Sequence, residues 1–63
     1  MEFKLYDRVQ IKELLSYGDD IYTIVTKTKD QEDNTMFALE DEDGFLMTEV
    51  YYYPSQLLKV YED

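Results

Sequence analysis

The 63-residue chain contains no cysteine, no histidine and no tryptophan. Without cysteine it has no disulfide and no Cys-ligated metal cluster, and without histidine the usual zinc sites and histidine-based acid/base pairs are excluded. A domain of this size buries only about 60% of the surface that its unfolded chain exposes. A single domain over residues 1–63 must therefore be held together by packing alone.

Long apolar runs are also missing. The longest uncharged apolar windows fall far short of the roughly 20 residues that a membrane span requires, and the first residues lack the basic segment and apolar run of a signal peptide. We therefore expect a protein that is neither exported by a recognisable signal nor inserted in a membrane. The absence of cysteine is compatible with a reducing compartment, and we expect a cytoplasmic location.

Basic residues are scarce, because 6 Lys and Arg accompany 15 Asp and Glu, for a net charge of −9. Residues 1–31 carry a net charge of −1, whereas residues 32–63 hold nine acids and only Lys59 as a base, for a net charge of −8. Such a surface repels nucleic-acid phosphates and acidic membranes and attracts basic partners. We expect stability that rises with salt, no direct nucleic acid binding and no membrane binding.

The middle of the chain shows the pattern of short β-strands. Residues 21–28 are almost wholly β-branched or aromatic, with apolar residues on both faces, which is typical of a central strand. Residues 29–34 are polar and predict a mobile hairpin loop. Residues 35–39 and 45–53 predict a second hairpin, in which Gly44 supplies the positive φ of the turn.

The C-terminal residues predict a helical turn and a last strand. Pro54 ends the preceding strand because it has no amide proton to donate. Residues 55–58 suit one 3₁₀ turn, with Leu57 or Leu58 closing the end of the core. Residues 59–61 then complete the sheet.

Two structures compete at the N-terminus. Residues 4–12 alternate as a half-buried strand. The side chains on its apolar side are Leu5, Asp7, Val9 and Ile11. A helix at about residues 8–17, capped by Asp7 and ended by Gly18, would instead pack on a small antiparallel sheet in an α+β fold. We favour the strand and an all-β fold, with Leu14, Leu15 and Tyr17 in a loop.

Five short strands with one late helical turn favour a small five-stranded SH3-like barrel with one 3₁₀ turn near the C-terminus. Residues 53–60 (YPSQLLKV) resemble the Pro-Ser-Asn-Tyr-Val run that ends SH3 domains. Residues 5–11, 22–25 and 39–44 are similar to the "G-D-x-V-x-I … Y-x-I-V … L-x-D-x-D-G" rhythm of small bacterial and prophage SH3-like proteins. The tryptophan of peptide-binding SH3 domains is absent, so the resemblance implies the fold and little of the PxxP-binding function.

The densest acidic run precedes Gly44 and raises the question of a calcium site. Its members are Glu40, Asp41, Glu42 and Asp43. An EF-hand loop with Gly44 at position 6 would place Leu39 at position 1 and Val50 at position 12, where carboxylate ligands are required. The acids are adjacent rather than divided across a cleft, and Ser16 and Ser55 have no evident base. We expect no metal, no cofactor and no enzyme activity.

Three consecutive tyrosines lie at the end of the predicted hairpin. Tyr51 and Tyr53 share one side of the strand, and Tyr52 lies on the other side with Val50. Tyr52 is expected in the core, and the outer pair either packs structurally or forms a contact surface, for which tyrosine is well suited.

Two interaction functions follow from these patterns. The leading hypothesis is a non-enzymatic interaction module that binds a protein partner with a basic or amphipathic surface. The candidate partner-binding residues are Glu40, Asp41, Glu42, Asp43, Glu49, Tyr51 and Tyr53. The alternative is an acidic nucleic-acid mimic that inhibits a DNA- or RNA-binding protein, with Glu32 and Asp33 extending the row of carboxylates. A third interpretation gives the acids no binding function: they only keep a small β protein soluble.

Overall fold

The fold is all-β, as predicted. The structure, a computed structural model, describes residues 3–18 and 20–61, and at residues 47–49 it describes the backbone only. The described residues form one sheet of five strands in the order β4-β3-β2-β1-β5, with every neighbouring pair antiparallel. The elements are β1 (Arg8–Ile11), η1 (Lys12–Leu14), β2 (Tyr22–Lys29), β3 (Thr35–Glu40), β4 (Leu46–Tyr52), η2 (Pro54–Gln56) and β5 (Leu57–Lys59), where η denotes a 3₁₀ turn.

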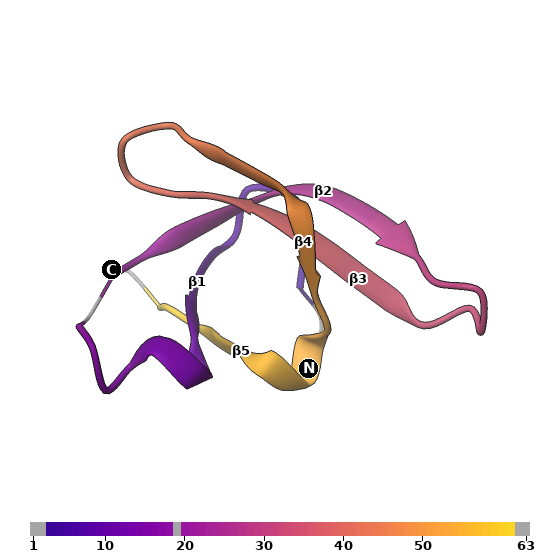
Figure 1. Ribbon diagram of the computed structural model, residues 1–63, viewed down its shortest axis with the longest axis horizontal. Helices are drawn as coiled ribbons and strands as arrows, with labels where there is room; N and C mark the ends of the chain where they lie inside the picture. Colours follow the sequence, from indigo (N-terminus) through magenta and orange to yellow (C-terminus); the bar gives the residue numbers. More distant parts are fainter. Residues whose placement is uncertain (1–2, 19, 62–63) are drawn as a thin grey trace.

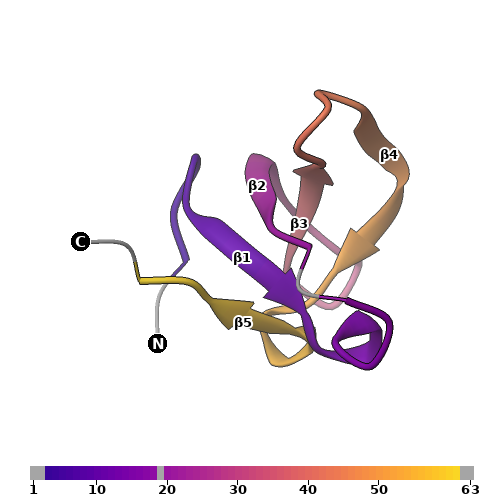
Figure 2. The same ribbon diagram turned by 90° about the vertical axis from the view of Figure 1, so that its left-hand side faces the viewer.

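The sheet is curled but open. Figures 1 and 2 show β1 and β5 on one side of the molecule and the β3–β4 hairpin on the other, with β2 joining them. β2 is the middle strand, which confirms its predicted central place. β4 and β5 are the two end strands and are not neighbours in the sheet, because β5 pairs with β1 through Ile11↔Leu57 and Val9↔Lys59. The closed barrel expected from the sequence is therefore not formed by the strand pairing.

One hydrophobic core joins the two sides of the curled sheet. The buried side chains of this cluster are Phe3, Val9, Ile11, Ile24, Phe37, Leu39 and Leu57. Phe3 meets Phe37 edge to face, with 5.8 Å between ring centroids, a geometry that aromatic pairs favour. Tyr22 and Tyr52 pack against the cluster from its margin. Tyr52 thus lies toward the core, as predicted, whereas Val50 is exposed.

The N-terminal prediction was too long as a strand and wrong as a helix. β1 comprises only Arg8–Ile11, followed by η1 and a turn, so the described residues contain no α-helix at 8–17. A tight turn precedes β1, in which the Asp7 carboxylate accepts a 2.9 Å bond from the Lys4 N–H and Tyr6 has a φ of 72°. The strand prevails because it buries Val9 and Ile11 in the shared core, whereas a capped helix gains only local bonds.

The C-terminal 3₁₀ turn begins one residue earlier than predicted, at Pro54, and the last strand begins at Leu57 rather than Lys59. The Gln56 side chain accepts a 2.9 Å bond from the Tyr53 N–H, which holds the start of the turn. The turn delivers Leu57 to the core at 3% exposure and leaves Leu58 on the outside at 44%. No helix in the described part of the chain is long and apolar enough to cross a membrane.

Candidate functional site

The acidic run forms a fixed turn between β3 and β4. Asp41 Oδ1 accepts bonds of 2.9 Å from the N–H groups of both Asp43 and Phe45. The Asp41 carbonyl accepts a 3.1 Å bond from the Gly44 N–H, and Gly44 has a φ of 85°, as its predicted role requires. Asp41 therefore organises the turn, while Glu42 and Asp43 project from it as exposed acids.

The loop between β2 and β3 is built in the same way. Asp30 Oδ1 accepts bonds from the Glu32 N–H at 2.8 Å and from the Asn34 N–H at 2.9 Å. Asp33 occupies the position in this loop that Gly44 occupies in the β3–β4 turn. It has a φ of 68°, and its N–H donates to the Asp30 carbonyl at 3.2 Å. These bonds give the predicted hairpin loop between β2 and β3 a defined hydrogen-bonding pattern. An aspartate at the first position of each five-residue loop is typical of such turns, and it is a signal that the sequence analysis did not use.

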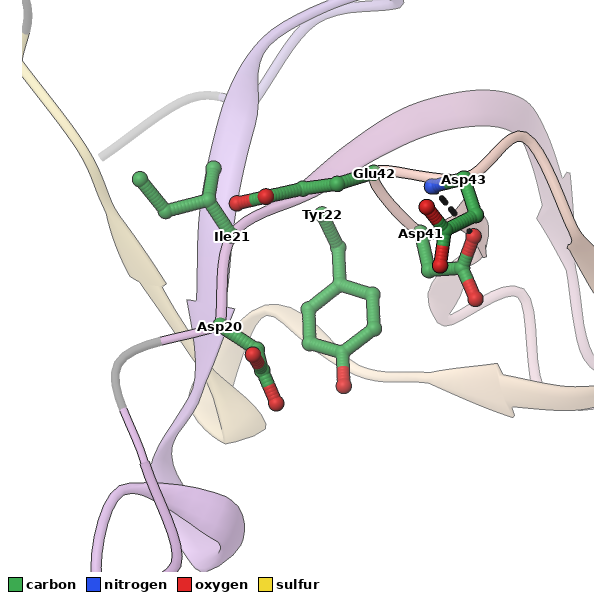
Figure 3. A pocket seen from close by; sticks show the side chains of 6 residues that line it. All are labelled: Asp20, Ile21, Tyr22, Asp41, Glu42 and Asp43. Atoms are coloured by element: carbon green, nitrogen blue, oxygen red, sulfur yellow. Dashed lines mark hydrogen bonds between the residues drawn. The ribbon is translucent and has the colours of Figure 1, made fainter.

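A pocket of about 220 Å³ lies beside the β3–β4 turn (Figure 3). Its lining residues are Asp20, Ile21, Tyr22, Asp41, Glu42 and Asp43. The pairing of Thr23 with Glu40 in the β2–β3 ladder explains the assembly, because antiparallel strands bring the residues before Thr23 beside those after Glu40. Figure 3 shows the Tyr22 ring between the carboxylates of Asp20 and Asp41.

The electrostatics of the pocket favour a positively charged guest. Burial and then the neighbouring Asp20 raise the pKa of Tyr22, with smaller contributions from Tyr52 and Asp41. Tyr22 therefore stays neutral at physiological pH and offers an aromatic face next to carboxylates. Cations bind both to aromatic faces and to carboxylate oxygens. The carboxylates line the pocket without converging, since no group of three or more metal-ligating side chains is found among the described residues.

The structure divides the predicted site into two parts. Asp41, Glu42 and Asp43 line the pocket, whereas Glu40 is the half-buried last residue of β3 and lies outside the lining. Tyr51 and Tyr53 are exposed by 41% and 38%, and neither lines the pocket. The side chain of Glu49 lies outside the described residues.

Tyr53 is bonded to the other hairpin loop. Its hydroxyl donates to Asp30 Oδ2 at 2.9 Å, which raises the pKa of Tyr53. The pKa of Asp30 is lowered, chiefly by the backbone bond from Asn34 and further by the Tyr53 hydroxyl. This contact supports a structural role for Tyr53. It lies near the beginning of β3, whereas the pocket lies near the end of β3.

Sequence reasoning missed Asp20, Ile21 and Tyr22 as members of the site. Tyr22 was expected in a strand, and it is the first residue of β2, whereas Asp20 lies just before this strand. Only the register of β2 against β3 brings them to the acidic turn, and the alternation of apolar residues leaves that register open.

No protein-family model matches the sequence of this chain, and searches of curated proteins and of solved structures found no match.

Proposed function

We propose that the chain is a non-enzymatic SH3-like interaction module that binds a basic protein surface at the acidic pocket. The observation that carries the proposal is the union of Asp20 with Asp41, Glu42 and Asp43 around the Tyr22 ring, from two separate parts of the sequence. A positive side chain entering this pocket would meet carboxylates from both sides. The high negative charge of the chain adds long-range attraction for such a partner.

The strand arrangement supports the SH3-like part of the proposal. β2, β3 and β4 form a meander, β1 pairs with both β2 and β5, and a 3₁₀ turn links β4 to β5. This connectivity agrees with a small curled sheet in which the first and last strands lie side by side. The single core contributed by β1, β2, β3 and β5 supports the same architecture.

The size of the pocket favours a side chain over a metabolite. Its volume of about 220 Å³ lies below the roughly 300–1,000 Å³ of small-molecule sites. The lining offers carboxylates, one tyrosine and Ile21, and it contains none of the serine, threonine, cysteine, lysine and histidine side chains on which most covalent catalysis depends. A lysine or arginine side chain fits this chemistry, with its stem against Tyr22 and its charge among the acids.

The positions of the acids favour the module over the nucleic-acid mimic. Glu32 and Asp33 lie in the loop before β3, and Glu42 and Asp43 lie in the turn after it. The intervening strand of 6 residues separates them by about 20 Å. Each strand of a duplex presents one phosphate about every 3.4 Å of helix axis. Two separated acidic groups reproduce this spacing less well than one continuous row would.

A titration with a tetra-arginine peptide, followed by amide NMR shifts at low salt, tests the proposal. The pocket variant Glu42→Gln/Asp43→Asn keeps Asp41, which holds the turn. The control Glu13→Gln/Glu32→Gln removes the same charge from exposed positions outside the pocket. We expect shifts around the pocket and an affinity loss of about fivefold for the pocket variant, as for two partly exposed ion pairs.

Three results would count against this assignment. Equal losses in the two double variants would reduce the binding to a general effect of net charge. Shifts that covered both acidic groups, including Glu32 and Asp33, would favour the nucleic-acid mimic. A stronger loss with Tyr51→Ala than with the pocket variant would move the contact to the tyrosines.

A further inference from the structure

β4 is an edge strand with an open side. It stands at one end of the strand order, so within residues 3–18 and 20–61 only β3 is its neighbour. Its pairing with β3 is also interrupted, because Phe37↔Tyr52 is followed directly by Leu39↔Met47. The register of the two strands therefore shifts between Phe37 and Leu39. One side of an edge strand faces no neighbouring strand of its own sheet, and a further strand can pair there.

The other edge of the sheet is better protected. β5 has 3 residues, compared with 7 in β4, and it begins directly after the η2 turn. It ends at Lys59, whose Nζ lies 3.3 Å from Asp7 Oδ2. Short strands, prolines, charged side chains and β-bulges are the usual means by which proteins prevent edge pairing. β4 contains neither proline nor lysine, and its protection is limited to one acid, Glu49, and the register shift in its pairing with β3.

Exposed apolar side chains accompany the open edge of β4. Leu46, Val50 and Tyr51 are exposed by 57%, 47% and 41%. An added strand would gain contacts with these side chains as well as backbone bonds, which is how strand addition combines affinity with selectivity. The open edge and the apolar residues thus point to an extended segment as the occupant.

We propose that an extended basic segment of a partner protein binds along β4 as a further strand of the sheet. This proposal rests on the proposed function for the charge of the partner and adds the mode by which that partner binds. The charge selects between the two extended segments that could pair here. Residues 32–63 carry −8, so a second copy of β4 would be repelled, whereas a lysine-rich segment would be attracted. The all-antiparallel sheet makes an antiparallel addition the expected one.

The test uses an octapeptide of alternating lysine and valine as the probe and a matched control peptide. The control carries N-methyl groups on two lysines and two valines, which removes amide donors from both edges of the peptide and leaves its charge unchanged. Affinity for the intact chain is measured at low salt, and amide hydrogen exchange is measured with and without peptide. We expect the unmodified peptide to bind at least tenfold more tightly and to slow exchange along Leu46–Tyr52 but not along Leu57–Lys59.

Equal affinity of the two peptides would overturn the inference, because charge alone would then explain the binding. If both peptides bound equally and slowed hydrogen exchange only at amides around the pocket, the proposed function would stand and the strand addition would fail. Absence of binding by either peptide would also overturn the strand addition, and the tetra-arginine titration would judge the pocket separately. A chain that sediments as a dimer, with β4 amides protected before peptide is added, would replace the basic segment by a second copy.

Discussion

Leu57 and Leu58 are adjacent, chemically identical residues that the fold treats in opposite ways. Leu57 is exposed by only 3% and belongs to the core cluster, whereas Leu58 is exposed by 44%. Truncation to alanine at each position therefore removes the same atoms from two different environments. The pair offers a direct test of how η2 and β5 orient the end of the chain.

The expected costs differ severalfold. Leu57→Ala loses the burial of its side chain and leaves a cavity beside Ile11, its partner in β1, for a cost of about 2–5 kcal/mol. Leu58→Ala removes a largely exposed side chain, for a cost of about 0.5 kcal/mol. A domain of 63 residues has a free energy of unfolding of roughly 3–9 kcal/mol. Leu57→Ala therefore consumes a large part of the total stability.

Urea unfolding followed by tyrosine fluorescence and circular dichroism measures both variants. With a urea dependence of about 1 kcal/mol per molar, Leu57→Ala should lower the midpoint by about 2 M or more. Thermal unfolding should show a fall of at least about 8 °C, against about 2–4 °C for Leu58→Ala. If Leu57→Ala is unfolded without urea, the milder pair Leu57→Val and Leu58→Val measures the same asymmetry. Equal costs, or a larger cost at Leu58, would refute the placement of β5.

The remaining predictions concern the aspartate-centred turns. The pKa values of Asp7 and Asp30 are lowered in the native state, so near these values the native state binds fewer protons than the unfolded state. The stability that these two carboxylates contribute is present above their unfolded pKa of 3.8, and it should be lost as the pH falls through the lower native values. Urea unfolding at pH 5 and pH 3 should show a smaller acid loss in Asp7→Asn and Asp30→Asn than in the parent chain, and an unchanged loss would refute the linkage. Gly44→Ala should cost about 1 kcal/mol because φ is 85° there, and a stability equal to that of the parent chain would contradict this strain. Tyr53→Phe removes the hydroxyl bond to Asp30 and should raise the pKa of that carboxyl toward its ordinary value in an NMR titration, whereas Tyr51→Phe, as the control, should leave it in place.

Much of the fold could be predicted because the residues involved favour one local structure. The β-branched run that became β2, Gly44 in the second hairpin and Pro54 at the end of β4 were all placed from their backbone preferences. The N-terminal segment was harder because Asp7 suits both a helix cap and a turn. Its carboxylate binds the Lys4 N–H, and this bond starts a turn instead of a helix.

The candidate site was only half predictable. Charge density identified Asp41, Glu42 and Asp43, but the sequence grouped them with Tyr51 and Tyr53, which lie outside the pocket. Residues that are close in sequence are not always close in the sheet, because an extended strand separates the residues at its two ends. The pocket partners Asp20 and Tyr22 come instead from the start of the neighbouring strand β2 and the segment just before it.

The sequence by itself determined the class of the fold, the strong negative charge, and the exclusion of histidine and cysteine chemistry, since these depend on residue types and local preferences alone. The tertiary structure decided what depends on register and curvature. It chose Leu57 over Leu58 for the core, turned Asp30 and Asp41 into the centres of two similar loops, and left β4 open at the edge of the sheet. Register is a property of paired strands, and a one-residue shift exchanges the two faces of a strand, so these outcomes were settled only when the strands met.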